Sequence, residues 1–153
     1  MFRSRGFSLI ELVIVVVIIG ILSAIALPRI SRGSEGAGIN AFVSEINTFA
    51  MLMDQYQIET GSMVADSATG VIPVELKDYL DANSWSGGTP LGGEWDVESN
   101  DSGVTLAVGV HYQNGFANIY GLKQVDTIID DGDLTTGAFR FIGARRYYLV
   151  LQE

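Results

Sequence analysis

The feature that most constrains this chain is an apolar run from Phe7 to Leu27, 21 residues in which Glu11 is the single charged side chain. A helix that rises about 1.5 Å per residue covers roughly 30 Å over this length, the thickness of a bilayer's hydrocarbon core. The apolar core of a secretory signal is usually shorter, about 7–15 residues. Because Arg3 and Arg5 precede the run, the positive-inside bias predicts a single-pass anchor with a cytoplasmic N-terminus.

Glu11 is the unusual residue of this run. A carboxylate at the centre of a spanning helix costs about 2.5–3.5 kcal/mol on insertion scales. Two interpretations stay open. The carboxylate sits near the headgroups and is tolerated there, or it pairs with a cation on another chain, since a buried charge is stable when it is paired.

The residues GFSLIE at 6–11, with basic residues before them and the apolar run after them, resemble the N-terminus of type IV pilins and type II secretion pseudopilins. The resemblance implies a leader, residues 1–6, that prepilin peptidase removes by cutting between Gly6 and Phe7 before it methylates Phe7. It also implies that Glu11 attracts the N-terminal ammonium of a neighbouring subunit during filament assembly. Pro28 matches the proline that commonly kinks or loosens the family's long helix.

Composition narrows the function further. The chain has no cysteine, so it departs from pilins with a C-terminal disulfide loop and offers no thiolate metal site. Its net charge of −9 would become −11 without the leader, with 7 basic against 18 acidic residues. This acidity argues against direct nucleic-acid binding and against docking on anionic lipid. His111 is the only histidine and no nucleophile motif lies near it, so we predict that the chain is not an enzyme.

The segment after the apolar run, residues 29–61, is predicted to be the amphipathic half of one long helix. Glycines at 33, 36 and 38 should weaken its beginning, because each costs roughly 1 kcal/mol relative to alanine. Gly61 is a natural C-terminal stop. Apolar residues at spacings of three and four form a stripe that should pack on a sheet: Ile39, Phe42, Ile46, Phe49, Met53 and Tyr56.

Residues 62–153 are predicted to form a globular domain of connecting loops and sheet. Short helices are expected at 73–80 and 122–130, and strands at 105–112, 116–120, 138–142 and 146–151. Asn114-Gly115 is a strong hairpin signal between the first two strands. We expect Trp85 and Trp95 to be buried. The predicted fold class is therefore α+β: a long N-terminal helix packed on a small antiparallel sheet of about four strands, as in pilins.

Four aspartates, Asp126, Asp130, Asp131 and Asp133, cluster around Gly132. Oxygen ligands at close spacing suit Ca²⁺, and the resemblance adds that some major pseudopilins bind calcium in their C-terminal loops. The spacing does not match an EF-hand, and a solvated acidic turn is the alternative.

The sequence thus predicts a filament subunit that assembles through its N-terminal helix, most simply a major-type pseudopilin of a type II secretion system. A type IV pilin for adhesion, motility or competence is the alternative, and a monomeric membrane-anchored binding domain is the alternative of another class. The resemblance implies further copies of the chain, prepilin peptidase, an inner-membrane assembly platform and minor pilins as partners. It places the subunit in a bacterial inner membrane with a periplasmic domain, and later in a periplasmic or surface filament.

Overall fold

The computed structural model describes residues 9–153, with side chains for all of these except residues 24–33. The predicted cleavage residues Gly6 and Phe7 lie outside the described residues. The chain divides into two units, the first ending at Gly36 and the second running over Ala37–Glu153.

One helix, α1 (Leu9–Thr60), contributes to both units. It ends where we predicted. Gly61 has a positive φ of 71°, and its N–H donates to the carbonyl of Gln57 at 2.8 Å. The backbone stays helical across the glycine-rich stretch at 33–38, so no loss of helix accompanies these glycines here. A helix already formed on both sides propagates through such residues at lower cost than it nucleates.

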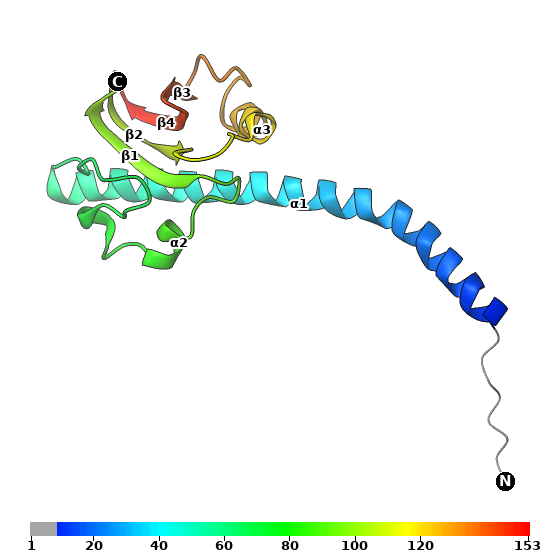
Figure 1. Cartoon of the computed structure of the whole chain (residues 1–153). Helices are drawn as coiled ribbons and strands as arrows, with labels where there is room; N and C mark the ends of the chain where they lie inside the picture. The colour runs from blue at the N-terminus through cyan, green and yellow to red at the C-terminus, as the bar shows by residue number, and fades with distance from the viewer. Residues whose placement is uncertain (1–8) are drawn as a thin grey trace, which may run out of the picture. The chain divides into compact units, whose positions relative to one another are not determined.

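The second unit contains a four-stranded antiparallel sheet, which confirms the α+β class. Its strands are β1 (Glu94–Asp101), β2 (Val104–His111), β3 (Phe139–Gly143) and β4 (Arg146–Gln152), in the spatial order β1-β2-β4-β3. The sheet lies along one side of α1, and the short helices η1 (Val74–Leu76) and α2 (Ala82–Ser86) lie on the other (Figure 1).

Aromatic side chains join α1 to both layers. The predicted stripe of α1 is buried from Ile39 to Met53, and Tyr56 is partly buried. Trp85 of α2 and Trp95 of β1 are fully buried, as predicted. Phe42 stacks on Trp95 with ring centroids 5.0 Å apart, and Phe49 lies 4.9 Å from both tryptophans. One core therefore spans the helix, the sheet and the α2 segment.

The predicted strand at 116–120 is wrong, and so is the hairpin at Asn114-Gly115. The side chain of Asn118 accepts a hydrogen bond from the N–H of Gly121 at 3.0 Å and caps α3 (Ile119–Ile129). An N-cap of this kind satisfies a backbone donor that has no partner within the helix. The chain therefore enters a helix at the point where we expected a strand.

The missing strand is β1, in a segment that we expected to be loop. The true hairpin joins β1 to β2 through Asp101–Val104. The predicted helix at 73–80 is also wrong in extent. Only a single 3₁₀ turn forms at η1, and α2 begins later, where the side chain of Asp81 accepts from the N–H of Asn83.

Candidate assembly segment and metal site

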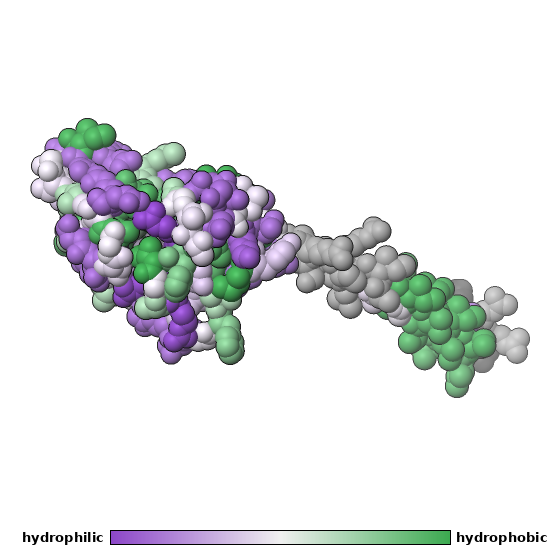
Figure 2. Space-filling model, turned by 90° about the horizontal axis from the view of Figure 1, so that it is seen from above, coloured by the Kyte–Doolittle hydropathy of each residue, from purple (hydrophilic) through white to green (hydrophobic). Residues whose placement is uncertain are grey.

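The first turns of α1 present apolar side chains on every side. From Leu9 to Leu22 the large apolar side chains are each 46–81% exposed, and Figure 2 shows them as one continuous hydrophobic surface. A helix that is apolar all round needs an apolar environment, such as a membrane or a bundle of like helices. Among the described residues alone, no helix is long and apolar enough to cross a membrane.

Of the predicted assembly residues, the structure places two in α1. Glu11 lies in the first turn of the helix. Pro28 lies within the helical range, and its side chain is outside the described part. The role of each in assembly stays a prediction.

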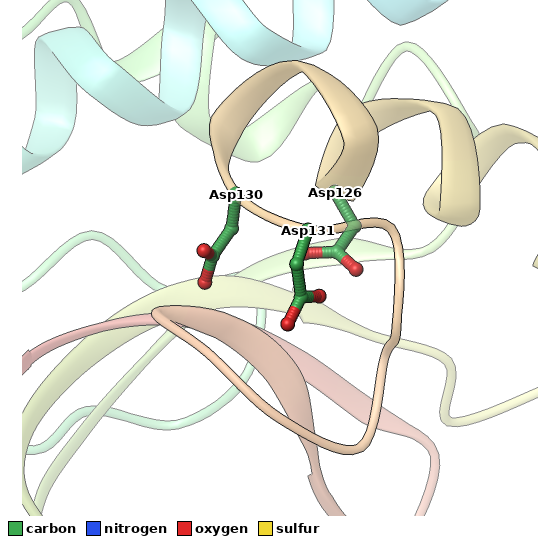
Figure 3. A group of neighbouring side chains, drawn as sticks. All are labelled: Asp126, Asp130 and Asp131. Carbon is green, nitrogen blue, oxygen red and sulfur yellow. The ribbon is translucent and has the colours of Figure 1, made fainter.

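Three of the four predicted metal ligands come together at the end of α3. Asp126, Asp130 and Asp131 each offer a carboxylate oxygen, and these oxygens lie within 4.8 Å of one another. Their carboxylates lie on the same side of the chain where α3 passes into the following loop (Figure 3). Asp133 is not part of this group; its carboxylate accepts hydrogen bonds from the N–H and hydroxyl of Thr135.

Asp126 is the unusual member of the group. Its side chain is fully buried, and among the described residues neither carboxylate oxygen accepts a hydrogen bond of normal geometry, although the N–H of Gly132 lies close enough to lower its pKa. Burial raises the pKa of this carboxyl to about 6, and the charges of Asp131 and Asp130 add to the shift. A buried carboxylate without a partner is costly. The residue therefore either holds a proton or faces a cation.

The other two aspartates are held by the loop at 131–138. Asp130 accepts a hydrogen bond from the N–H of Ala138. Asp131 accepts from the N–H of Asp133 at 2.8 Å and from the hydroxyl of Thr136 at 2.9 Å. Gly137, with φ of +77°, suits this place, because a Cβ there would clash with a carboxylate oxygen of Asp130. The three carboxylates could hold a hard divalent cation, for which oxygen ligands are preferred.

A second polar cluster lies on the face of the sheet that is turned away from α1. The buried carboxylate of Asp96 accepts hydrogen bonds from the hydroxyls of Tyr148 at 2.6 Å and Thr69 at 3.0 Å. Nδ1 of His111 lies 2.9 Å from the Thr69 hydroxyl and 3.4 Å from the carboxylate. Thr69 and Asp96 thus meet the same ring nitrogen, whereas a catalytic triad needs the nucleophile and the acid on opposite nitrogens.

Glu98, one pleat along β1, shares this face. Its buried carboxylate pairs with the guanidinium of Arg146 at 2.6 Å. Burial raises the pKa of Glu98 to about 7, Arg146 offsets part of the shift, and the nearby charges of Asp66, Asp96 and Asp101 add to it. Our reading of the sequence missed this cluster. The alternation of acidic and apolar residues in EWDVE at 94–98 was the available signal.

Glu98→Gln should flatten the pH dependence of stability. The folded pKa of about 7 lies above the ordinary value of 4.5, so the folded chain binds this proton more tightly than the unfolded chain. The stability that it contributes is complete below pH 4.5 and is lost as pH rises through 7, at up to about 1.4 kcal/mol per pH unit. Urea unfolding from pH 4.5 to 8 measures this decline, which should be smaller in the variant. An equal decline in both proteins would contradict the assignment.

Comparison with known proteins identifies the family of this chain. Residues 1–27 match the prokaryotic N-terminal methylation motif. The type IV narrow pilus major component PilA5 of Thermus thermophilus is 32% identical over 108 residues, which cover 67% of this chain and 78% of that protein. The chain belongs to the family of type IV pilins and type II secretion pseudopilins.

Other relatives match this pilin-family chain over different lengths. The type IV wide pilus major component PilA4 of Thermus thermophilus is 26% identical over 67% of the chain and 86% of that protein. Type II secretion system core protein G of Pectobacterium carotovorum is 33% identical over 58 residues, 38% of this chain and only 37% of the relative's length. No solved structure matches the chain.

Proposed function

We propose that this chain is the major-type subunit of a type IV pilus, a filament of many copies built through the apolar segment at 7–27. The observation that carries the proposal is the length of chain over which it is similar to pilus subunits. The two Thermus relatives that match two thirds of the chain are both named as major pilus components, whereas the match to protein G of Pectobacterium covers 58 residues. The chain can therefore share its domain, and not only its helix, with pilus subunits.

A type II secretion pseudopilin is the second candidate. It is favoured by the absence of cysteine and by the buried aspartate at the end of α3, which suits a calcium-dependent loop. Deletion of the gene separates the two machines. Loss of surface pili or twitching supports the pilus, and loss of exoprotein secretion with pili intact supports the pseudopilus.

Assembly in either filament would follow from the same physics. Prepilin peptidase would free and methylate Phe7, an inner-membrane platform with minor subunits would extract the anchor, and the apolar helices would bundle. Glu11 of one subunit would meet the ammonium of a neighbour's Phe7. Pairing stabilises both groups, because each charge alone is costly in a medium of low dielectric constant.

The mass of the N-terminal peptide tests this proposal. It should be measured from native membranes and from the sheared extracellular fraction. A methylated peptide that starts at Phe7 in both fractions supports an exported pilus. The same peptide confined to membranes favours a periplasmic pseudopilus. An intact Met1, or a cut after the apolar run, would overturn the filament function.

We also propose that the carboxylates of Asp126, Asp130 and Asp131 hold Ca²⁺. Support comes from the buried oxygens of Asp126, which accept no hydrogen bond of normal geometry among the described residues, and from the short spacing of the three groups. Bound calcium would supply charge to neutralise these carboxylates and tie the loop at 131–138 to α3.

Asp126→Asn should change stability in opposite directions with and without calcium. In a chelator at pH 7 the variant should be more stable by about 1–3 kcal/mol, because it removes a buried carboxylate whose pKa is raised by burial. With calcium the unaltered chain should gain stability and the variant should not. Thermal unfolding measures both effects, and Asp133→Asn, outside the group, is the matched control. An unaltered chain with the same melting temperature with and without calcium would refute this proposal.

A further inference from the structure

A basic and aromatic surface stands out on an otherwise acidic domain. Phe116 is 100% exposed, and Ile119 and Tyr120, at the start of α3, are 43% and 63% exposed. Lys123 lies on α3 one turn further along, and Arg145 donates a hydrogen bond to the carbonyl of Gly115 at 3.2 Å. We call this surface the basic aromatic patch: Phe116, Ile119, Tyr120, Lys123 and Arg145.

The cations of this patch are rare in the domain. Residues 37–153 contain 16 acidic and 5 basic side chains. Arg140 and Arg146 form ion pairs with Glu153 and Glu98, whereas Lys123 and Arg145 form none within the described residues. Hydrogen bonds from Thr135 lower the pKa of Asp133, and the charge of Lys123 adds to this shift. An acidic surface is therefore the complementary partner for this patch.

A second exposed surface lies on α1, opposite the core. Met51 and Ile58 are 70% and 84% exposed, seven residues and so two turns apart on one face. Asp54 lies between them and Glu59 follows, and both are exposed. We call this surface the acidic stripe: Met51, Asp54, Ile58 and Glu59. The acidic stripe combines exposed apolar side chains with negative charge, which is complementary to the positive charge of the basic aromatic patch.

The two surfaces lie at opposite ends of the domain. The patch follows the end of β2, where the hydroxyl of Tyr112 donates to the carbonyl of Leu91 at 3.3 Å and Leu91 in turn lies beside Gly38. The stripe lies at the other end, where Gln57 accepts from Gln152 of β4 at 2.8 Å. Along α1 the positions 38 and 58 are about 30 Å apart.

We propose that the basic aromatic patch of one subunit docks on the acidic stripe of a second copy of this chain. The inference rests on the proposed filament function and names a contact between its globular domains. Because the two surfaces differ and lie at opposite ends, the contact is heterologous and repeats along a filament instead of closing a dimer. A lipid surface is the less suitable partner, since anionic headgroups repel so acidic a domain.

Cysteine cross-linking of assembled filaments tests the contact cleanly, because the chain has no cysteine of its own. A chain that carries both Phe116→Cys and Ile58→Cys, treated with a short bis-maleimide, should give a ladder of covalent multimers. Either substitution alone should give no ladder. Phe116→Cys with Val74→Cys, which replaces a 70% exposed residue outside both surfaces, is the matched control and should also give none.

Other outcomes would overturn the contact. Dimers from Phe116→Cys alone would show that the patch meets itself. Filaments without a ladder, or with an equal ladder in the control, would exclude this pairing and leave the filament function intact. If anionic vesicles protect the cysteine of Phe116→Cys from maleimide labelling and no ladder forms, the patch binds lipid instead. If the unaltered chain forms no filament at all, both the proposed function and this contact are wrong.

Charge reversal gives an independent readout. Lys123→Glu and Asp54→Lys should each reduce filament yield at low salt about tenfold, as for a residue at the centre of an interface. The two changes in one chain should restore most of the yield. Failure of the double variant to exceed either single variant would contradict the pairing.

Discussion

Glu11→Ala is expected to leave the chain in the membrane fraction and to reduce the yield of assembled filament more than about tenfold. The reason is the charge that remains. Without the carboxylate, the ammonium of a neighbour's Phe7 would be buried in the filament core without its partner, and removing one member of a buried pair typically costs about 3–5 kcal/mol. Filament yield is measured from the sheared fraction against the amount of subunit in membranes.

The matched control is Glu35→Ala, which removes an exposed carboxylate of the same helix outside the apolar run. It should assemble at nearly the normal yield. Normal assembly of the Glu11 variant would refute the pairing mechanism and favour the alternative that this glutamate is only tolerated near the headgroups. Loss of the variant from membranes would instead indicate a role in insertion.

Phe42→Ala should destabilise the domain by about 3–5 kcal/mol, the usual cost of deleting a buried aromatic ring. Phe42 is fully buried and contacts the rings of Trp95 and Phe139 at centroid distances of 5.0 and 6.1 Å. A domain of this size is stable by only about 5–15 kcal/mol, and no disulfide supports this one. Urea unfolding of the processed chain in detergent, followed by tryptophan fluorescence, measures the loss.

Phe116→Ala is the control, since it makes the same chemical change at a ring that is 100% exposed. Its unfolding midpoint should match that of the unaltered chain. Equal destabilisation by both substitutions would mean that the α1 stripe is not the centre of the core. A stable Phe116 variant that assembles poorly would agree with a contact between subunits.

The sequence predicted the helical part of the fold because the information for it is local. A helix closes its hydrogen bonds within four residues and repeats every 3.6. The spacing of Ile39, Phe42 and Ile46 was therefore enough to place the core face of α1, and Gly61 was enough to place its end. The processing motif at Gly6 and Phe7 is equally local, since it depends on the order of a few residues and not on their packing.

The strands were predicted less well, because a strand bonds to partners far along the chain. The N-cap at Asn118 starts the helix at 119–129. This cap depends on one side chain, so we gave it less weight than the Asn114-Gly115 turn pattern, which does not form a hairpin. In β1 the alternation in EWDVE at 94–98 favoured a strand, but Asp and Glu are depleted in sheets, which weakened this signal.

The sequence by itself determined the long helix, the face of it that is buried and the N-terminal motif that marks the family. Only the tertiary structure decided which acidic residues are buried. One carboxylate oxygen of Asp96 accepts hydrogen bonds from Thr69 and Tyr148, 27 and 52 residues away in sequence, and Asp126 lies buried beside Asp130 and Asp131. The physical reason is that the cost of burying a charge depends on groups that folding brings together, which no local pattern records.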